Sequence, residues 1–344
     1  MKILYSIQAT GNGHISRAME ILPYLEQYGQ VDIFLSGANS TLSLDLPIKY
    51  RSKGLCIFYN TRGGLSYLEM AKHFAPFRML QEVKELPVEK YDLILNDFES
   101  ITALACAFKK IPSVNFGHQA SFKSSKTPRP EKKDRIGEWI LQHYAKASQY
   151  IGLHFESYDD FILPPVIKKS VIEAEPENKG HITVYLSSFG DSEMLKNLMP
   201  LKDYRFQVFS KEVKQPVIAG NVEFIPVNRE AFSRSLISCH GIITGAGFET
   251  PAEALWLGKK LMVIPIGGQY EQDCNAEALK RMGVVSLKKL DESFALTFNQ
   301  WINAENKIIY RPALDTESII RFVISHGMRN KRASDISFGG LATS

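Results

Sequence analysis

Short, almost uninterrupted apolar segments alternate with helical stretches along this chain, and the alternation runs through it twice. The segments are rich in β-branched and aromatic residues and lack a polar side, which is typical of parallel strands buried on both faces. This pattern predicts βαβ units and an α/β fold with two doubly wound, Rossmann-like sheets. The predicted strands cover residues 3–7, 31–35, 55–59, 91–95, 113–116 and 150–155, and then 181–186, 205–209, 222–226, 241–244 and 260–264.

The break between the two series defines the domains. The segment 161–165, which contains Pro164 and Pro165, is expected to interrupt regular structure. Ligands bind beyond the carboxyl ends of the strands in such sheets, so a central cleft is expected between the two domains. The predicted units are an N-terminal domain over residues 1–162, a linker over 163–180, a C-terminal domain over 181–315, and a helix at 316–326 with a loosely held tail within 316–344.

Charge and cysteine usage exclude several classes of protein. The net charge of +4 is too small to indicate a nucleic-acid partner. The four cysteines show no Cys-x-x-Cys spacing, so neither zinc nor a redox pair is indicated, and a reducing cytoplasm is expected. The chain starts in a strand pattern rather than a signal peptide, and no apolar run approaches the ~18 residues that span a bilayer.

A glycine turn in the second half is suited to a phosphate group. The strand at 241–244 runs into Gly245 and Gly247, and a helix is expected from about Phe248. Glycines let the backbone approach a ligand, and the amides at a helix N-terminus favour a diphosphate. Thr250 adds a hydroxyl group, and the Glu253 carboxylate could accept both hydroxyls of a ribose.

A polar loop is expected at residues 267–275, after the next strand. Glu271 and Gln272 offer hydrogen-bonding groups suited to a hexose, and Asn275 is expected to cap or pin a helix over 276–282. The alternative for the whole run is a glycine turn of an ordinary α/β protein followed by a solvated loop.

A second glycine loop supplies a candidate base. Gly11 and Gly13 lie between the first strand and the first helix, and His14 stands at the helix N-terminus. Because a positive helix end disfavours imidazolium, His14 is expected to be neutral and able to take a proton from an acceptor hydroxyl. The alternative is a capping or core histidine. Ser16 replaces the third glycine of a dinucleotide fingerprint, so binding of a nicotinamide cofactor is disfavoured.

A carboxylate often orients such a base. Asp97 is the preferred partner of His14, and Glu99 is the alternative partner and a candidate acceptor contact. Both follow the strand at 91–95, where loop polarity or helix capping would explain them equally well. His118, after the strand at 113–116, is a further candidate for acceptor contact, with a satisfied loop histidine as the alternative.

Together these segments resemble the donor and acceptor motifs of GT-B glycosyltransferases. The similarity is strongest to the peptidoglycan N-acetylglucosaminyltransferase and UDP-glycosyltransferase group, and to a bacterial branch with a Gly-Gln-aromatic-Glu-Gln loop, here Gly268–Gln272. Residues 11–18 match the group's Gly-x-Gly-His-x-x-Arg-Ala loop, Glu253 its ribose-binding glutamate, and Glu271 with Gln272 its sugar-binding pair. The resemblance also implies donor contacts at Gly13, Ser188, Ile225, Gly245, Gly247, Phe248 and Thr250.

The resemblance implies an inverting glycosyltransferase that moves a hexose from a nucleotide-sugar, expected to be a UDP-sugar, to a hydroxyl of a small-molecule, lipid-linked or cell-envelope acceptor. The Asp-x-Asp sequence with which a metal-dependent class binds a divalent ion is absent. We therefore expect no metal or other cofactor, and charge stabilisation by helix dipoles and amides. The alternatives are a nucleotide-sugar 2-epimerase or hydrolase of the same fold, or a non-catalytic nucleotide-sugar-binding partner.

Two features fit less simply. Glu249 places a negative charge beside the expected diphosphate, which the sequence explains only if its side chain points away. Residues 123–135 carry six lysines and arginines against two acids and are expected to form a mobile loop. This loop, with the apolar segment 74–80, could contact an anionic inner membrane surface or a lipid-diphosphate acceptor, so peripheral membrane association is possible. The alternative is a solvated loop and a packed helix.

Overall fold

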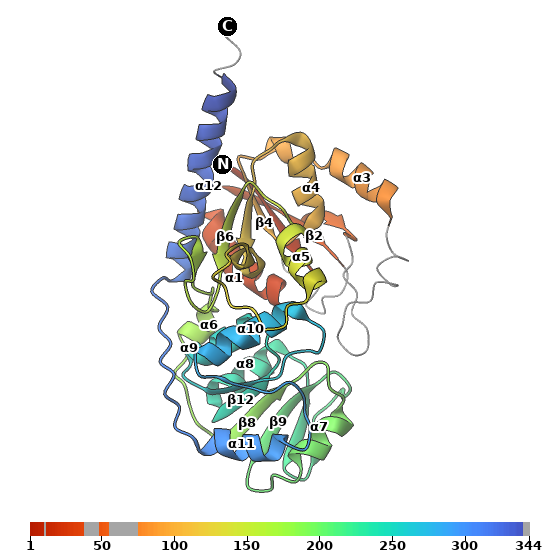
Figure 1. Ribbon diagram of the computed structural model, residues 1–344, viewed down its shortest axis with the longest axis vertical. Helices are drawn as coiled ribbons and strands as arrows, with labels where there is room; N and C mark the ends of the chain where they lie inside the picture. Colours follow the sequence, from red (N-terminus) through yellow and green to blue (C-terminus); the bar gives the residue numbers. More distant parts are fainter. Residues whose placement is uncertain (10–11, 38–47, 55–74, 340–344) are drawn as a thin grey trace.

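The computed structural model describes residues 1–9, 12–37, 48–54 and 75–339, and it contains two sheets stacked along the long axis of the molecule (Figure 1). Gly11 and the predicted strand at 55–59 lie outside the described residues. Within the described residues, each sheet has seven strands. The two doubly wound domains predicted from the sequence are confirmed.

The first sheet is parallel throughout, in the order β3-β2-β1-β4-β5-β6-β7. Alternate residues of β1 are buried on opposite faces, with Ile3, Tyr5 and Ile7 in one core cluster and Leu4 in another. Burial on both faces explains why the apolar runs are continuous. The strands are β1 (Lys2–Gln8), β2 (Gln30–Ser36), β3 (Ile48–Ser52), β4 (Leu93–Asp97), β5 (Val114–Gly117), β6 (Gln149–Leu153) and β7 (Ile162–Leu163).

Helices cover both faces of this sheet (Figure 1). In α1, the buried residues Ile15, Ala18, Ile21 and Leu25 recur every three or four positions and pack on the sheet. The helices of this domain are α1 (Asn12–Glu26), α3 (Pro76–Glu85), α4 (Ser100–Lys109) and α5 (Arg135–His143), with short 3-10 segments η1 (Val88–Lys90) and η2 (His118–Lys123).

The second sheet has the order β10-β11-β9-β8-β12-β13-β14, and all its strands are parallel except the edge strand β10. Its strands are β8 (His181–Tyr185), β9 (Arg205–Ser210), β10 (Val217–Ala219), β11 (Val222–Pro226), β12 (Gly241–Thr244), β13 (Lys260–Val263) and β14 (Val285–Ser286). Its helices are α7 (Asp191–Leu198), α8 (Arg229–Ser238), α9 (Glu249–Trp256), α10 (Tyr270–Arg281) and α11 (Phe294–Asn303), and α6 (Lys169–Ile172) lies in the segment between the domains.

The structure corrects several boundaries. The segment 161–165 was expected to be irregular but contains β7, which pairs with β6. The predicted loop at 267–275 is largely the first two turns of α10. The last helix, α12 (Thr316–Gly339), continues well past residue 326, so a loose tail from that point is wrong.

Helix α12 returns to the first domain and packs beside α1 (Figure 1). Ile319, Ile320 and Val323 are buried in the core that α1 shares. A Cβ atom on Gly327 would lie only 2.6 Å from Leu93 Cδ1, so a glycine allows this close approach to the sheet.

Candidate active site

The carboxyl end of β4 and the first turn of α1 bring His14 and Asp97 together. His14 Nδ1 lies 2.9 Å from Asp97 Oδ1, and Asp97 is completely buried. Because ionised Asp97 can only accept, this contact needs a proton on Nδ1 and leaves Nε2 with its lone pair, although Arg17 NH2, which can only donate, also lies 3.0 Å from Nδ1. That is the tautomer that a general base acting through Nε2 requires.

The charge state expected for His14 from the helix N-terminus alone needs correction. Burial lowers the pKa of His14, but the charge of Asp97 and its hydrogen bond outweigh burial, and the pKa is raised above its ordinary value. Burial likewise raises the pKa of Asp97, but Arg17 and His14 hold it below its usual range. Asp97 therefore stays ionised and makes His14 a stronger base.

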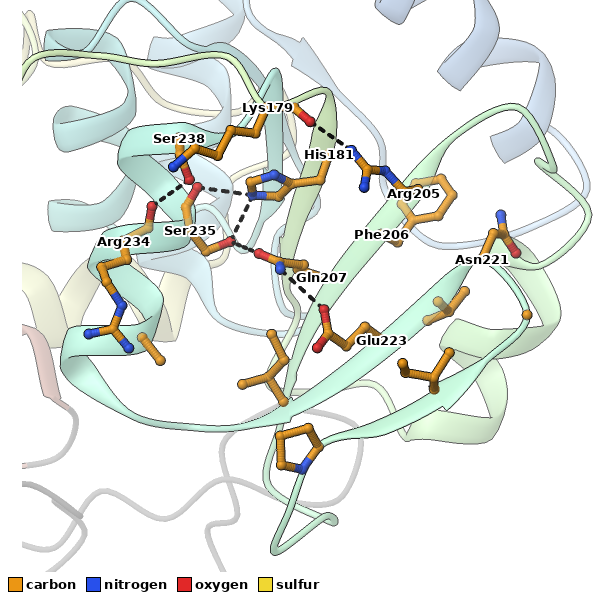
Figure 2. Close-up of a pocket in the computed structure, with 16 residues that line it drawn as sticks. Lys179, His181, Arg205, Phe206, Gln207, Asn221, Glu223, Arg234, Ser235 and Ser238 are labelled. Atoms are coloured by element: carbon orange, nitrogen blue, oxygen red, sulfur yellow. Dashed lines mark hydrogen bonds between the residues drawn. The ribbon is translucent and has the colours of Figure 1, made fainter.

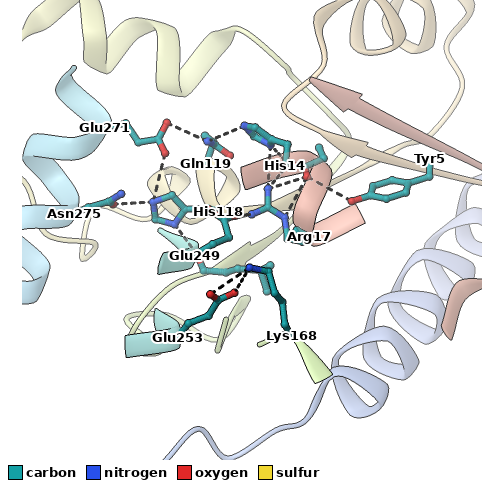
Figure 3. Close-up of polar contacts among 12 residues, drawn as sticks. Tyr5, His14, Arg17, His118, Gln119, Lys168, Glu249, Glu253, Glu271 and Asn275 are labelled. Atoms are coloured by element: carbon teal, nitrogen blue, oxygen red, sulfur yellow. Dashed lines mark hydrogen bonds and ion pairs between the residues drawn. The ribbon is translucent and has the colours of Figure 1, made fainter. Parts of the chain in front are cut away.

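Arg17 also belongs to the site, although the sequence pattern gave its side chain no role. It is buried, and its NH2 group lies 2.8 Å from Asp97 Oδ1. Its NH1 group donates to Glu249, at the start of α9 in the other domain (Figure 3). This ion pair supplies the compensating charge that the sequence near Glu249 lacks.

A small cavity lies at the carboxyl ends of β8 and β12. Its volume is about 120 Å³, and Gly247 faces open space there, since a Cβ atom on it would meet nothing within 4 Å. The structure thus gathers at one place the predicted donor contacts Ser188, Gly245, Gly247, Thr250 and Gln272.

Glu253 lies in the second turn of α9 and is buried. Its carboxylate is 2.9 Å from the ammonium group of Lys168, which comes from the segment between the domains (Figure 3). Burial raises the pKa of Glu253, with Lys168 partly opposing that effect. Nothing in the sequence pattern singled out Lys168.

Glu271 faces the base through Gln119. The side-chain nitrogen of Gln119 lies 3.0 Å from Glu271 Oε2 and 3.5 Å from His14 Nε2 (Figure 3). The amide oxygen of Gln119 is buried and has no hydrogen-bond partner among the residues that the structure describes. Such an unpaired acceptor costs free energy that a further donor would recover.

His118 and Glu99, the candidate acceptor contacts, are each held by other partners in the structure. His118 is buried between Leu153 O at 2.9 Å and Asn275 Oδ1 at 2.7 Å, and its ring stacks on Phe248. Burial lowers its pKa. His118 thus belongs to the contact between the domains, as does Phe248. Asn275 lies inside α10 and does not cap a helix.

The Glu99 carboxylate caps α4 by accepting from the backbone amides of Ile101 and Thr102. Both of its oxygens are occupied and buried, so the alternative of helix capping describes Glu99 better than substrate contact does.

Ile225, another of the expected donor contacts, does not line the small cavity. It lines a groove of about 740 Å³ between α8 and the strands β9 and β11 (Figure 2). Hydrogen bonds join Gln207, Glu223 and Ser235 along this groove.

The basic segment 123–135 is more ordered than expected. Arg129 pairs with Glu138 at 2.9 Å and its guanidinium lies over the ring of Phe122, while Lys126 pairs with Asp159. Lys132, Lys133 and Arg135 are exposed. Phe74 of the apolar segment 74–80 lies outside the described residues, but Phe77 is 89% exposed. In the part of the chain that the structure describes, no helix is long and apolar enough to cross a membrane.

The chain belongs to glycosyl transferase family 1, whose sequence model matches residues 1–302. None of the curated proteins matches it. Its fold is similar to the glycotransferase of kitacinnamycin, at TM-score 0.59 and 14% identity over 97% of both chains. It is also similar to UGT2 of Phytolacca americana, complexed with UDP-2-fluoro-glucose and pterostilbene, at TM-score 0.54 and 14% identity over 94% of this chain and 88% of that one.

MurG of Acinetobacter baumannii shares the fold at TM-score 0.54 and 14% identity, over 90% of this chain and 92% of the other. At these identities the similarity establishes the GT-B fold, and the family match establishes the activity class. The protein is a glycosyltransferase that moves a glycosyl group from a nucleotide-sugar to an acceptor.

Proposed function

We propose that this enzyme transfers a hexose from a UDP-sugar to an acceptor hydroxyl with inversion at the anomeric carbon. The observation that carries the proposal is the buried Asp97 carboxylate, which holds His14 with Nε2 available beside Gln119 and Glu271. A base on the acceptor side suits a single displacement, in which no enzyme nucleophile intervenes.

In the proposed reaction, His14 Nε2 takes the proton of the acceptor hydroxyl while its oxygen attacks the anomeric carbon. The bond from that carbon to the diphosphate breaks, and the electron pair leaves with UDP. Asp97 stabilises the imidazolium that forms, since it remains ionised. The displacement inverts the anomeric centre because the acceptor oxygen attacks one face of the anomeric carbon and the diphosphate leaves from the opposite face.

We assign the donor to the second domain. The diphosphate would lie against the amides at the start of α9 and the Thr250 hydroxyl, in the small cavity that Ser188, Gly245 and Gly247 line. These groups would stabilise the leaving charge without a metal ion. A solved relative of the same fold holds a UDP-sugar analogue, which supports UDP as the nucleotide.

A thermal-shift screen of UDP, TDP, GDP and CDP with EDTA present tests the donor assignment. We expect UDP to raise the melting temperature and EDTA to leave that shift unchanged. A shift with another nucleotide would replace UDP, and a shift that needs Mg²⁺ would contradict metal independence. Incubation of the UDP-sugar without acceptor then separates transfer from hydrolysis or epimerisation.

We also propose peripheral contact with an anionic membrane as the route to a lipid-linked acceptor. Helices α3 and α4 pack together in the first domain and expose Phe77, Leu80, Leu104 and Phe108. Sedimentation with phosphatidylglycerol vesicles should carry the protein down, whereas a Phe77→Ser/Leu80→Ser variant should stay in solution. Ile309→Ser changes a residue of similar exposure in the chain segment after α11 and serves as the control. Equal sedimentation of all three proteins would contradict the proposal.

A further inference from the structure

The buried guanidinium of Arg17 pairs with one carboxylate from each domain. On its own side it binds both carboxylate oxygens of Asp97, each 2.8 Å from NH2. On the other side NH1 donates to Glu249, the first residue of α9. A guanidinium presents its donors in a rigid planar fork, so one side chain can hold two carboxylates in a fixed relation.

The backbone of the first domain is shaped to admit Glu249. A Cβ atom on Gly13 would lie 2.6 Å from Glu249 Oε2, so a larger residue at this position would push the carboxylate aside. Glu249 therefore lies against the first turn of α1, which carries His14, and also pairs with Arg17. Both contacts place the start of α9 beside the base.

We propose that Arg17 is a positioning residue that links the His14–Asp97 pair to the donor-binding helix α9 through Glu249, so that the base is aligned when the two domains are closed on each other. The inference rests on the proposed role of His14 as base. The same ion pair explains how Glu249 is tolerated beside the donor, because Arg17 neutralises a carboxylate that would otherwise repel a diphosphate held near Thr250.

The pH dependence separates this role from simple packing. Arg17 lowers the pKa of His14 by its charge, whereas Glu249 raises it, although burial and Asp97 have larger effects. Removing the arginine charge should therefore raise the pKa of His14, and removing the glutamate charge should lower it. Among the described residues, the charged groups nearest His14 are Asp97 on β4, Arg17 on α1 and Glu249 on α9. Two more titratable groups lie one contact further away: Tyr5 on β1, which contacts Asp97, and Glu271 on α10, which contacts Gln119.

The test compares kcat, KM and the pH profile of Arg17→Met, Arg17→Lys, Glu249→Gln and the Arg17→Met/Glu249→Gln double variant. We expect Arg17→Met to lower kcat on the order of 100-fold, the effect of a misplacement of about 1 Å at a reacting group. The acidic limb of its pH profile, where activity falls as His14 is protonated, should move to higher pH. The acidic limb of Glu249→Gln should move to lower pH. The double variant should be no slower than Arg17→Met, because the two residues act as a unit.

Arg17→Lys keeps the charge but loses the fork, so its acidic limb should stay in place while kcat remains low. Arg129→Met is the matched control, because Arg129 also pairs with a glutamate in the first domain but lies outside the His14 network. It should lower stability and leave the pH profile unchanged. If the acidic limb of the pH profile lies at the same pH in all these variants, the inference is wrong.

Titration of His14 by NMR with labelled histidine measures its pKa without an acceptor. If Arg17→Met does not fold, Glu249→Gln and Arg17→Lys still test the inference. A higher pKa of His14 in Arg17→Met and a lower one in Glu249→Gln support the linkage. Without Arg17→Met, a lower pKa in Glu249→Gln beside an unshifted but slow Arg17→Lys supports it, and a Glu249→Gln titration equal to that of the wild type overturns it. Absence of transfer by the wild-type enzyme would instead overturn the proposed function, so the two failures are distinguishable.

Discussion

His14 and Asp97 are 83 residues apart, yet their side chains meet at 2.9 Å. The reason is the parallel register of β1 and β4, which places Ile7 opposite Asp97. Helix α1 begins within a few residues of the end of β1, so its first turn lies directly over the carboxyl end of β4. Adjacent parallel strands thus bring a base and its orienting carboxylate to one edge of the sheet.

His14→Ala should abolish transfer and leave nucleotide binding almost intact. Loss of a general base costs about 100- to 10,000-fold in rate, and His14 has no part in the cavity that we assign to the diphosphate. Transfer kinetics and UDP titration calorimetry on the same preparation check this. An equal loss of UDP affinity would move His14 to the donor site.

The activity should fall on the acidic side at a pH above the ordinary His value of about 6.5. Asp97 raises the pKa of His14, and a base works only when deprotonated, so activity is present above the raised pKa and is lost as the pH falls through it. In Asp97→Asn the pKa should drop, and the acidic limb of kcat should move to lower pH while kcat itself decreases. A limb that stays in place in Asp97→Asn would show that another group titrates.

The sequence could predict what local pattern and strand topology determine. The apolar runs indicated the strands. His14 follows the first predicted strand and Asp97 follows the strand predicted at 91–95, so both were expected at the carboxyl edge of the sheet. Ser188, Gly245 and Thr250 follow two adjacent strands of the second sheet and meet for the same reason. Short edge strands such as β10 escaped detection because an apolar run of 3 residues is too short to indicate a strand.

Contacts between the domains could not be predicted, because no periodicity encodes how two sheets dock. Arg17 with Glu249 and His118 with Asn275 are separated by 232 and 157 residues. The role of Glu99 was ambiguous for another reason. A carboxylate between a strand and a helix can cap the helix or face the cleft, and only the backbone geometry of α4 decides between them.

Glu253→Gln and Glu271→Gln should separate the ribose from the transferred sugar. If Glu253 accepts a ribose hydroxyl, as its match to the family's ribose-binding glutamate implies, Glu253→Gln loses a charge-assisted hydrogen bond and UDP should bind about 10- to 100-fold more weakly. Glu271→Gln should bind UDP normally and raise only the KM of the UDP-sugar, because UDP lacks the hexose. Calorimetry with UDP measures the first effect, and kinetics with the UDP-sugar measures the second. Weaker UDP binding in Glu271→Gln would reverse the two assignments.

Two glycines offer a matched pair of substitutions, one in the ligand cavity and one in the fold. A Cβ atom on Gly247 meets no atom within 4 Å, so Gly247→Ala should change the unfolding free energy by less than about 0.5 kcal/mol. Its methyl group would occupy the space we assign to the diphosphate, and UDP affinity should fall about tenfold, or ~1.4 kcal/mol.

Gly152→Ala should have the opposite profile. A Cβ atom there would lie 2.5 Å from the backbone Cα of Ser121, in the 3-10 segment η2 that carries His118 and Gln119. Overpacking against backbone should lower stability by about 1–3 kcal/mol, measured by denaturant unfolding. UDP affinity should be unchanged, because Gly152 lies in the first domain, while kcat should decrease as η2 moves Gln119 away from His14. Normal UDP binding by Gly247→Ala would exclude the small cavity as the diphosphate site, whatever the result at Gly152.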